Sequence, residues 1–380
     1  MRCTTPIKLR YSHFVKKVYT CCTIMDEICI CNDGNNETCE QSYLFVPSAW
    51  IIFTQFGLAA ECAIVNTIVI VIFLHPKNRT PSTILLSALA ATDCLTAIIS
   101  QIPYFVAYIF HYDELFVDED GYFGGWLWPE LYSSCIVFTP LSNISFGFHT
   151  ISICLTVMLN IQKVVALQFP LWTMLNVGNK STVSVICLIF IVVVSMFAWV
   201  TVSDSRTLFK GEDDACCYKD PLNANDIEGF TTATKVFMIV AVLVVILCTA
   251  YICVKLWTLG RNIQRTRNPI SQRKTRLSAL IVVIVSVVFI LSEVLNILRA
   301  INQSRLVPFV LMIEMINDSF ILLSWQIGFS FNFVIYLMMS GNLRNTLKTF
   351  FISLFQCKKK TQLQNTTSCA SISNNTSTHI

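Results

Sequence analysis

Charged residues are scarce in this chain. Asp, Glu, Lys and Arg make up 13% of the 380 residues, whereas hydrophobic residues make up 54%. A soluble domain carries about a quarter charged residues, so most of this surface must face something other than water. The chain also lacks a stretch of basic residues interleaved with aromatics, which argues against nucleic-acid binding. The composition therefore excludes an ordinary soluble domain.

The usual motifs of enzymes and metal sites are missing as well. The sequence contains no HExxH motif, no GxSxG motif and no paired intramembrane Asp pattern, so we expect no catalytic activity. The cysteines near the N-terminus do not form CxxC pairs with zinc-finger spacing. We therefore expect neither a metal site nor a cofactor.

No secretory signal peptide precedes the first apolar block, so we expect the first helix to direct membrane insertion. Residues 1–24 contain five basic residues and no acid, a composition that is awkward for translocation. From Met25 onward the segment is acidic and carries a glycosylation sequon at Asn36. We therefore expect translation to start at Met25 and Asn36 to be glycosylated.

Seven apolar blocks are long enough to cross a bilayer, which takes about 20 residues in a helix. They predict helices over residues 49–74, 82–110, 134–161, 182–203, 234–257, 277–299 and 307–339. Pro103 and Pro140 fall inside the second and third blocks, where we expect kinks rather than helix ends. The predicted fold class is an all-α membrane protein with a seven-transmembrane helix bundle.

The charges of the connecting loops predict the orientation of the bundle. Short cytoplasmic loops are enriched in Lys and Arg, and such residues follow the first, fifth and seventh blocks. The loop after the second block, residues 111–130, contains acids but no Lys or Arg. We therefore expect a protein of the plasma membrane with an extracellular N-terminus and a cytoplasmic C-terminus.

Beyond the seventh block, apolar residues recur at helical spacing with basic residues between them. They predict a short amphipathic eighth helix along the inner membrane face, and Cys357 at its end is a candidate for palmitoylation. The tail that follows is rich in Ser, Thr and Asn, and we expect it to be disordered. The predicted order is an extracellular segment at 1–48, the bundle at 49–339, the amphipathic helix at 340–357 and the tail at 358–380.

Polar residues inside a bilayer are costly and usually face the interior of the bundle. Asn66 lies in the first block, Asp93 in the second, and Asn332 and Tyr336 in the seventh. We expect these side chains to hydrogen-bond between helices, either as packing contacts or as parts of a switch.

Several short motifs resemble those of the rhodopsin-like G-protein-coupled receptors. The motifs are Asn66, the LAxxD pattern ending at Asp93, residues 155–157 (LTV), Gln162-Lys163-Val164 in place of (D/E)RY, Pro170-Leu171, and Asn332 to Tyr336 in place of NPxxY. The resemblance spans all seven helices. It implies that these residues serve activation and coupling to a heterotrimeric G protein, with arrestin binding to the Ser/Thr-rich tail.

A narrower resemblance is to invertebrate receptors for FMRFamide-like peptides, myosuppressin and sex peptide. Residues 148–156 resemble their FHTASIWLT segment, Ser292-Glu293 their Thr-Glu, and Asn332-Phe333 their Asn-Phe. The resemblance also implies a disulfide from Cys135 to Cys216 or Cys217. The acids Glu293, Glu314 and Asp318 would then attract a cationic peptide, unless they pair internally with Arg299 or Arg305.

The helix-three motif departs from both groups of receptors. Gln162 replaces its acid and Lys163 replaces its arginine, so no neighbouring carboxylate holds Lys163. We therefore expect measurable signalling without ligand, which Gln162→Glu should lower. We also expect Lys163→Ala to weaken agonist responses, provided that Lys163 supports coupling.

The sequence thus predicts a receptor for an amidated cationic neuropeptide. The alternative is a nematode-type chemosensory receptor for small environmental molecules, which the altered residues 162–164 favour. A more distant alternative is a seven-helix ligand-gated channel of the insect odorant-receptor kind, whose N-terminus lies inside, opposite to the orientation predicted here.

Overall fold

The computed structural model describes only part of the chain, and some side chains at element ends also lie outside the description. The described residues are 29–30, 38–41, 43–46, 49–110, 126–129, 132–210, 216–219, 224–262, 269–303 and 318–339. Asn36, Glu314, the predicted amphipathic helix at 340–357 and Cys357 lie outside the described residues. The predictions for them stay predictions.

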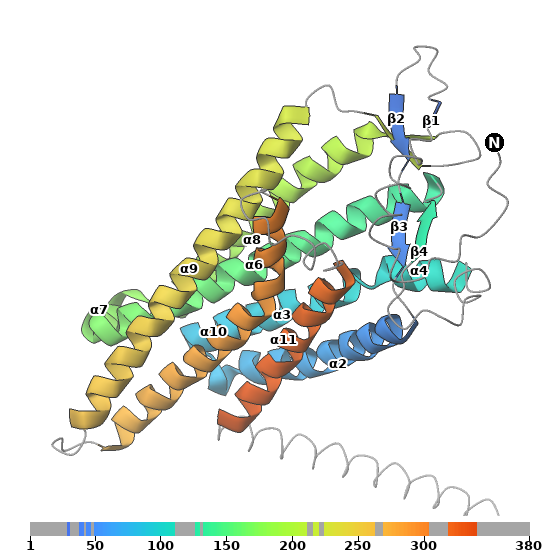
Figure 1. Ribbon diagram of the computed structural model, residues 1–380. Coiled ribbons are helices and arrows are strands. Elements are labelled where there is room, and N and C mark those ends of the chain that lie inside the picture. The colour runs from blue at the N-terminus through green and yellow to red at the C-terminus, as the bar shows by residue number, and fades with distance from the viewer. Residues whose placement is uncertain are drawn as a thin grey trace, which may run out of the picture. The chain divides into compact units, whose positions relative to one another are not determined.

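Helices dominate the described chain (Figure 1). Six of the seven apolar blocks fall in one helix or in two consecutive helices, and the seventh is helical over its described residues 318–339, which confirms the predicted fold class. The helices are α2 (Ala49–Leu74), η2 (Pro76–Asn78), α3 (Pro81–Ile99), α4 (Ile102–Phe110), α6 (Tyr132–Gln168), α7 (Pro170–Asn176), α8 (Asn179–Thr207), α9 (Ala224–Asn262), α10 (Pro269–Gln303) and α11 (Asp318–Met339).

One predicted kink is a helix end instead. Helix α3 ends at Ile99 and α4 begins at Ile102, so the second block is interrupted just before Pro103. A proline lacks an N–H group, and its ring clashes with the carbonyl four residues earlier, which here belongs to Ile99. Pro140 lies inside α6, which continues on both sides of it as predicted.

Six helical segments of the described residues are long and apolar enough to cross a membrane. Large apolar side chains point outward from them: Leu188 and Ile191 on α8 are 60% and 64% exposed, and Leu247 on α9 is 70% exposed. In water such side chains would be driven into a core. Here they form the surface that lipid covers.

The turn between α2 and α3 satisfies the backbone groups that helix ends leave unpaired. Asn78 Nδ2 donates to the carbonyl of Ile72 at 3.0 Å, and Arg79 Nε donates to that of Leu74 at 2.7 Å. At the start of α3, Thr80 and Thr83 each accept the other's backbone N–H through the hydroxyl oxygen, as in a capping box. The short link therefore needs few bonds from elsewhere.

The chain divides into two compact units, each with its own packing. Unit 1 comprises residues 1–56, 99–148 and 191–236, and unit 2 comprises residues 57–98, 149–190 and 237–380. Several long helices contribute residues to both units.

Unit 1 contains short strands that the sequence did not predict. An antiparallel sheet has the order β1-β2-β6-β5, built from Cys29–Ile30, Thr38–Gln41, Cys216–Lys219 and Leu208–Lys210. A second pair joins β3 (Tyr43–Val46) to β4 (Trp126–Pro129). These pairings connect the segment before α2 with the segments around α6 and α8.

Within unit 1, helices α6 and α8 pack closely against each other. A Cβ atom at Gly147 would lie 3.2 Å from Cγ of Phe197, so a larger residue there would press on that ring. Phe197 also contacts Phe146 and, edge to face, Phe230. Asn143 Nδ2 donates to Asp204 Oδ2 at 2.8 Å, which adds a polar contact between α6 and α8.

Helices α10 and α11 of unit 2 lie side by side (Figure 1). A Cβ atom at Gly328 would lie 2.9 Å from Cβ of Ser292, so only glycine allows the two helices to approach this closely. The hydroxyl of Ser324 donates to the carbonyl of Ser292 at 3.0 Å. This contact fixes α10 against α11 beside the polar groups described next.

Candidate functional site

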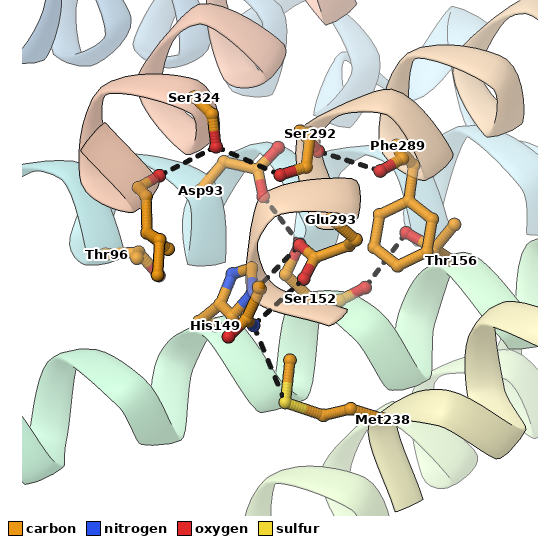
Figure 2. Close-up of polar contacts among 12 residues, drawn as sticks. Asp93, Thr96, His149, Ser152, Thr156, Met238, Phe289, Ser292, Glu293 and Ser324 are labelled. Carbon is orange, nitrogen blue, oxygen red and sulfur yellow. Dashed lines mark hydrogen bonds and ion pairs between the residues drawn. The ribbon is translucent and has the colours of Figure 1, made fainter. Parts of the chain in front are cut away.

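A buried carboxylate joins three helices of unit 2. Asp93 on α3 is 1% exposed and accepts two hydrogen bonds, of which Figure 2 shows the one from Ser152. Ser152 Oγ on α6 donates to its Oδ1 at 2.6 Å, and Asn332 Nδ2 on α11 donates to its Oδ2 at 3.3 Å. Because every partner sits on a different helix, the carboxylate ties α3, α6 and α11 together.

The backbone of Asp93 extends these contacts to α2. Cys62 Sγ lies 3.9 Å from the backbone carbonyl of Asp93, and Asn66 Nδ2 donates to that sulfur at 3.0 Å. Both Cys62 and Asn66 are fully buried. The structure therefore brings Asn66, Asp93 and Asn332 into one hydrogen-bonded chain, as their positions in the sequence predicted.

A buried ion pair lies in the same unit. His149 Nε2 on α6 is 3.0 Å from Glu293 Oε1 on α10, and both side chains are at most 2% exposed. Asn296 Nδ2 donates to the other carboxylate oxygen at 3.2 Å and also lies 3.7 Å from the sulfur of Met238 on α9. The pair thus connects α6 with α10, and Asn296 extends the contact to α9 (Figure 2).

An aromatic side chain from α11 covers this ion pair. The ring of Trp325 stacks on His149 with centroids 3.7 Å apart and an interplanar angle of 23°. Phe329, one turn further along α11, lies 6.3 Å from the same imidazole. The rings exclude water, and electrostatic interactions are stronger in such surroundings than at a surface.

The buried side-chain amide of Asn160 joins α6, α9 and α10. Asn160 Oδ1 accepts hydrogen bonds from Ser286 Oγ at 2.9 Å and from Thr249 Oγ1 at 3.5 Å, and its Nδ2 donates to the carbonyl of Thr156. Asn160 and Ser286 are fully buried. A displacement of α10 relative to α6 must break the bond between Asn160 and Ser286.

Lys163 is held by a hydroxyl group. Its Nζ donates to Ser82 Oγ on α3 at 2.9 Å, and that oxygen donates in turn to Gln162 Oε1 at 3.4 Å. The sequence predicted only that no neighbouring carboxylate holds Lys163, and the structure adds a hydroxyl contact that the sequence did not predict. Close by on α6, Gln168 accepts a hydrogen bond from the hydroxyl of Tyr251 on α9.

The structure places the other predicted site residues as follows. Glu293 pairs with His149, and the side chains of Arg299 and Arg305 lie outside the described ones. Asp318 begins α11, and Cys216 and Cys217 begin β6, but their side chains lie outside the described ones, as does that of Tyr336. Pro170 and Leu171 begin the short helix α7. Cys135 is fully buried and does not belong to the free cysteines of the described helices.

Sequence reasoning missed two members of this polar core. Neither His149 nor Asn160 was among the predicted site residues. Each is a polar residue within an apolar helix, and such residues usually have a partner on another helix. That signal was present for both, but it does not identify the partner.

The helices that carry these contacts match a known family. Residues 131–332 match the model of the family described as serpentine type 7TM GPCR chemoreceptor Srv. The match includes the ion pair, Asn160, Lys163 and Asn332, and it covers more than half of the 380 residues. No curated protein matches the chain. The chain belongs to the Srv family of serpentine seven-transmembrane G-protein-coupled chemoreceptors, and it is a multi-pass membrane receptor rather than a member of an enzyme family.

Proposed function

We propose that this protein is a chemosensory receptor that binds a small environmental molecule and signals to a heterotrimeric G protein. The observation that carries the proposal is the match of residues 131–332 to a chemoreceptor family. This match favours the chemosensory alternative over the neuropeptide receptor that the resemblance to FMRFamide-type receptors implied.

The surroundings of Glu293 also favour a small molecule. The neuropeptide hypothesis needs Glu293 as one of three acids that attract a cationic peptide, but its carboxylate is buried and paired with His149. On α11, Gln326 is 1% exposed, and among the described residues neither polar atom of its amide has a hydrogen-bond partner. An unpaired buried amide costs about 1–3 kcal/mol, which a ligand with hydrogen-bonding groups would recover.

The buried contacts supply a route from ligand to G protein. A ligand changes the balance between two receptor conformations only if it binds one of them more tightly. Polar contacts between described residues hold helix α10 through Glu293 to α6, through Ser286 to Asn160 and through Ser292 to α11. A ligand that weakens the contact at Glu293 would therefore favour a conformation in which α10 is displaced.

A ligand screen tests the proposal. Cells that express the receptor are challenged with volatile and water-soluble small molecules and, in parallel, with amidated peptides, and calcium and cAMP are recorded. We expect responses to members of the small-molecule set. Saturable responses to amidated peptides, with none to the small molecules, would favour the neuropeptide receptor instead. A ligand-gated current that persists without G protein would favour a channel.

The same proposal places the N-terminus outside the cell and the C-terminus inside. It rests on the basic residues after the first, fifth and seventh apolar blocks and on the acidic loop at 111–130. Lys163, Ser82 and α7 would then lie toward the cytoplasm, where the G protein binds. Arrestin binding to the tail at 358–380 stays a prediction of the rhodopsin-like resemblance.

The contact between Lys163 and Ser82 gives a first prediction. Ser82→Ala removes the hydroxyl that accepts a hydrogen bond from the ammonium group of Lys163. Hydrogen bonds to charged groups contribute about 1.5–3 kcal/mol. We expect ligand-independent signalling to rise roughly tenfold in that variant, as in any two-state receptor that loses a resting-state contact. Gln162→Glu supplies a carboxylate and should lower the basal signal. The assay is cAMP or calcium in the absence of ligand, at matched surface expression.

Ser87→Ala is the control for that experiment. Ser87 is buried on the same helix, but its hydroxyl donates to the carbonyl of Thr83 within α3. Its loss should leave the basal signal unchanged. A receptor that is silent without ligand, and stays silent in Ser82→Ala, would show that other contacts hold the resting state.

A disulfide at Cys135 gives a second prediction. Cys135 and Leu208 are buried together, and Leu208 lies opposite Tyr218, next to Cys217 on the paired strand. This arrangement supports the pairing of Cys135 with Cys216 or Cys217. We expect Cys135→Ser, and loss of the true partner, to reduce surface expression or ligand binding. Cys187→Ser is the control, because Cys187 is free and exposed on α8. The pairing is wrong or dispensable if all three single changes behave like the control.

A further inference from the structure

The short helix α7 presents apolar side chains that nothing in the described chain covers. Leu171 is 77% exposed, Trp172 54% and Leu175 85%, and Phe169 just before the helix is 58% exposed. Positions 171, 172 and 175 fall on one face of a helix. We call these three residues and Phe169 the α7 apolar stripe. In water a patch of this kind would be unfavourable.

The hydrogen bonds of the same segment are satisfied within it. Thr173 Oγ1 donates to the carbonyl of Phe169 and Asn176 Nδ2 to that of Trp172, both at 3.0 Å. Phe169 N donates to the carbonyl of Val165, and Val177 N donates to that of Thr173. The polar side chains of α7 are therefore turned back onto its own backbone, an arrangement that suits surroundings with little water.

The position of α7 between two membrane-spanning segments places it close to the membrane surface. The membrane-spanning segment of α6 ends at Gln168 and that of α8 begins at Asn179, so the stripe begins where one span ends and finishes close to the next. The flanking helices already expose Ile161 and Val183 to lipid, at 41% and 46%. Trp is enriched at the boundary between membrane and water, which matches the presence of Trp172.

We propose that the α7 apolar stripe inserts into the lipid interface and anchors the loop between α6 and α8 to the membrane surface. The occupant of the stripe in the resting receptor is the acyl-chain boundary of the bilayer. Since α7 follows α6 directly, the anchor restrains the end of α6 that carries Lys163. The inference does not depend on the chemosensory function, because lipid contact is measured without any agonist.

Photolabelling of the full-length receptor tests the anchor. The receptor is placed in nanodiscs of phosphatidylcholine that carries a diazirine in its acyl chain, and a second sample receives a water-soluble diazirine. Mass spectrometry then quantifies the label on residues 169–177. The lipid-exposed face of α8 around Ile191 and the polar link at 76–80 are references within the same molecule. We expect acyl-chain labelling of the stripe to exceed that of the link about tenfold.

A variant and a partner complete the test. The triple change Leu171→Gln, Trp172→Gln and Leu175→Gln should move the label from the lipid reagent to the aqueous one, while Thr173→Ser should not. The labelling of the unchanged receptor decides the question even if the triple variant fails to fold. Aqueous labelling of the unchanged stripe, equal to that of the link, overturns the proposal. Protection of the stripe only after purified G protein is added overturns it too, in favour of a protein-docking surface.

Discussion

His149→Leu is expected to destabilise the folded receptor by about 3–5 kcal/mol, because removal of one partner of a buried salt bridge leaves the carboxyl group of Glu293 buried without the other. Of the contacts described for Glu293, only the hydrogen bond from Asn296 would remain. The site is also shielded from water by the rings of Trp325 and Phe329. The measurements are the apparent unfolding temperature in detergent and the amount of receptor at the cell surface. Both should fall.

The double variant His149→Leu, Glu293→Leu is the matched control. It removes both polar groups together, and a buried pair can often be exchanged for apolar residues at little cost. We expect surface expression to recover compared with His149→Leu alone, so the two changes should be strongly non-additive. If the pair also couples α6 to α10, the recovered receptor should give a smaller maximal response to ligand. Equal loss of stability in the single and the double variants would contradict the ion pair.

Asp93→Leu is expected to abolish most of the ligand response. The change leaves the hydroxyl of Ser152 and the amide of Asn332 without their shared acceptor. Each buried donor left unpaired costs about 1–3 kcal/mol, and the tie between α3, α6 and α11 is lost. Asp93→Asn keeps the shape and one acceptor oxygen, so we expect a milder loss. Concentration–response curves at matched surface expression measure both variants.

Thr92→Val provides the comparison for Asp93. Thr92 is fully buried beside Asp93, but its hydroxyl donates to the carbonyls of Ala88 and Leu89 within α3. Its removal should change the response little. If Asp93→Leu and Thr92→Val gave the same response curves, the hydrogen bonds of Asp93 to α6 and α11 would not be needed for the ligand response.

The sequence predicted where the helices lie better than where they end. A bilayer requires about 20 apolar residues per span, and this requirement marks each block clearly. Helices α9 and α10 nevertheless extend beyond the predicted 234–257 and 277–299, because a helix can continue into polar residues where hydropathy gives no signal. The β5–β6 pairing could not be predicted either, since its strands have only three and four residues.

The site was predictable in part. The motifs of the rhodopsin-like receptors pointed to Asn66, Asp93 and Asn332, and the structure joins them. Glu293 was predicted to bind a ligand, with pairing to Arg299 or Arg305 as the alternative, and the structure places it against His149 from another helix. A sequence shows that a buried acid needs a partner, but only the packing of α6 against α10 determines which one it receives.

Ser292 fastens α10 to α11. The missing side chain at Gly328 brings the two helices together, and the hydroxyl of Ser324 holds the carbonyl of Ser292. This close contact allows α10 to tilt against α11 but resists sliding of one helix along the other. When α10 rotates as a rigid helix about Ser292, an outward movement of one end is accompanied by an inward movement of the other end.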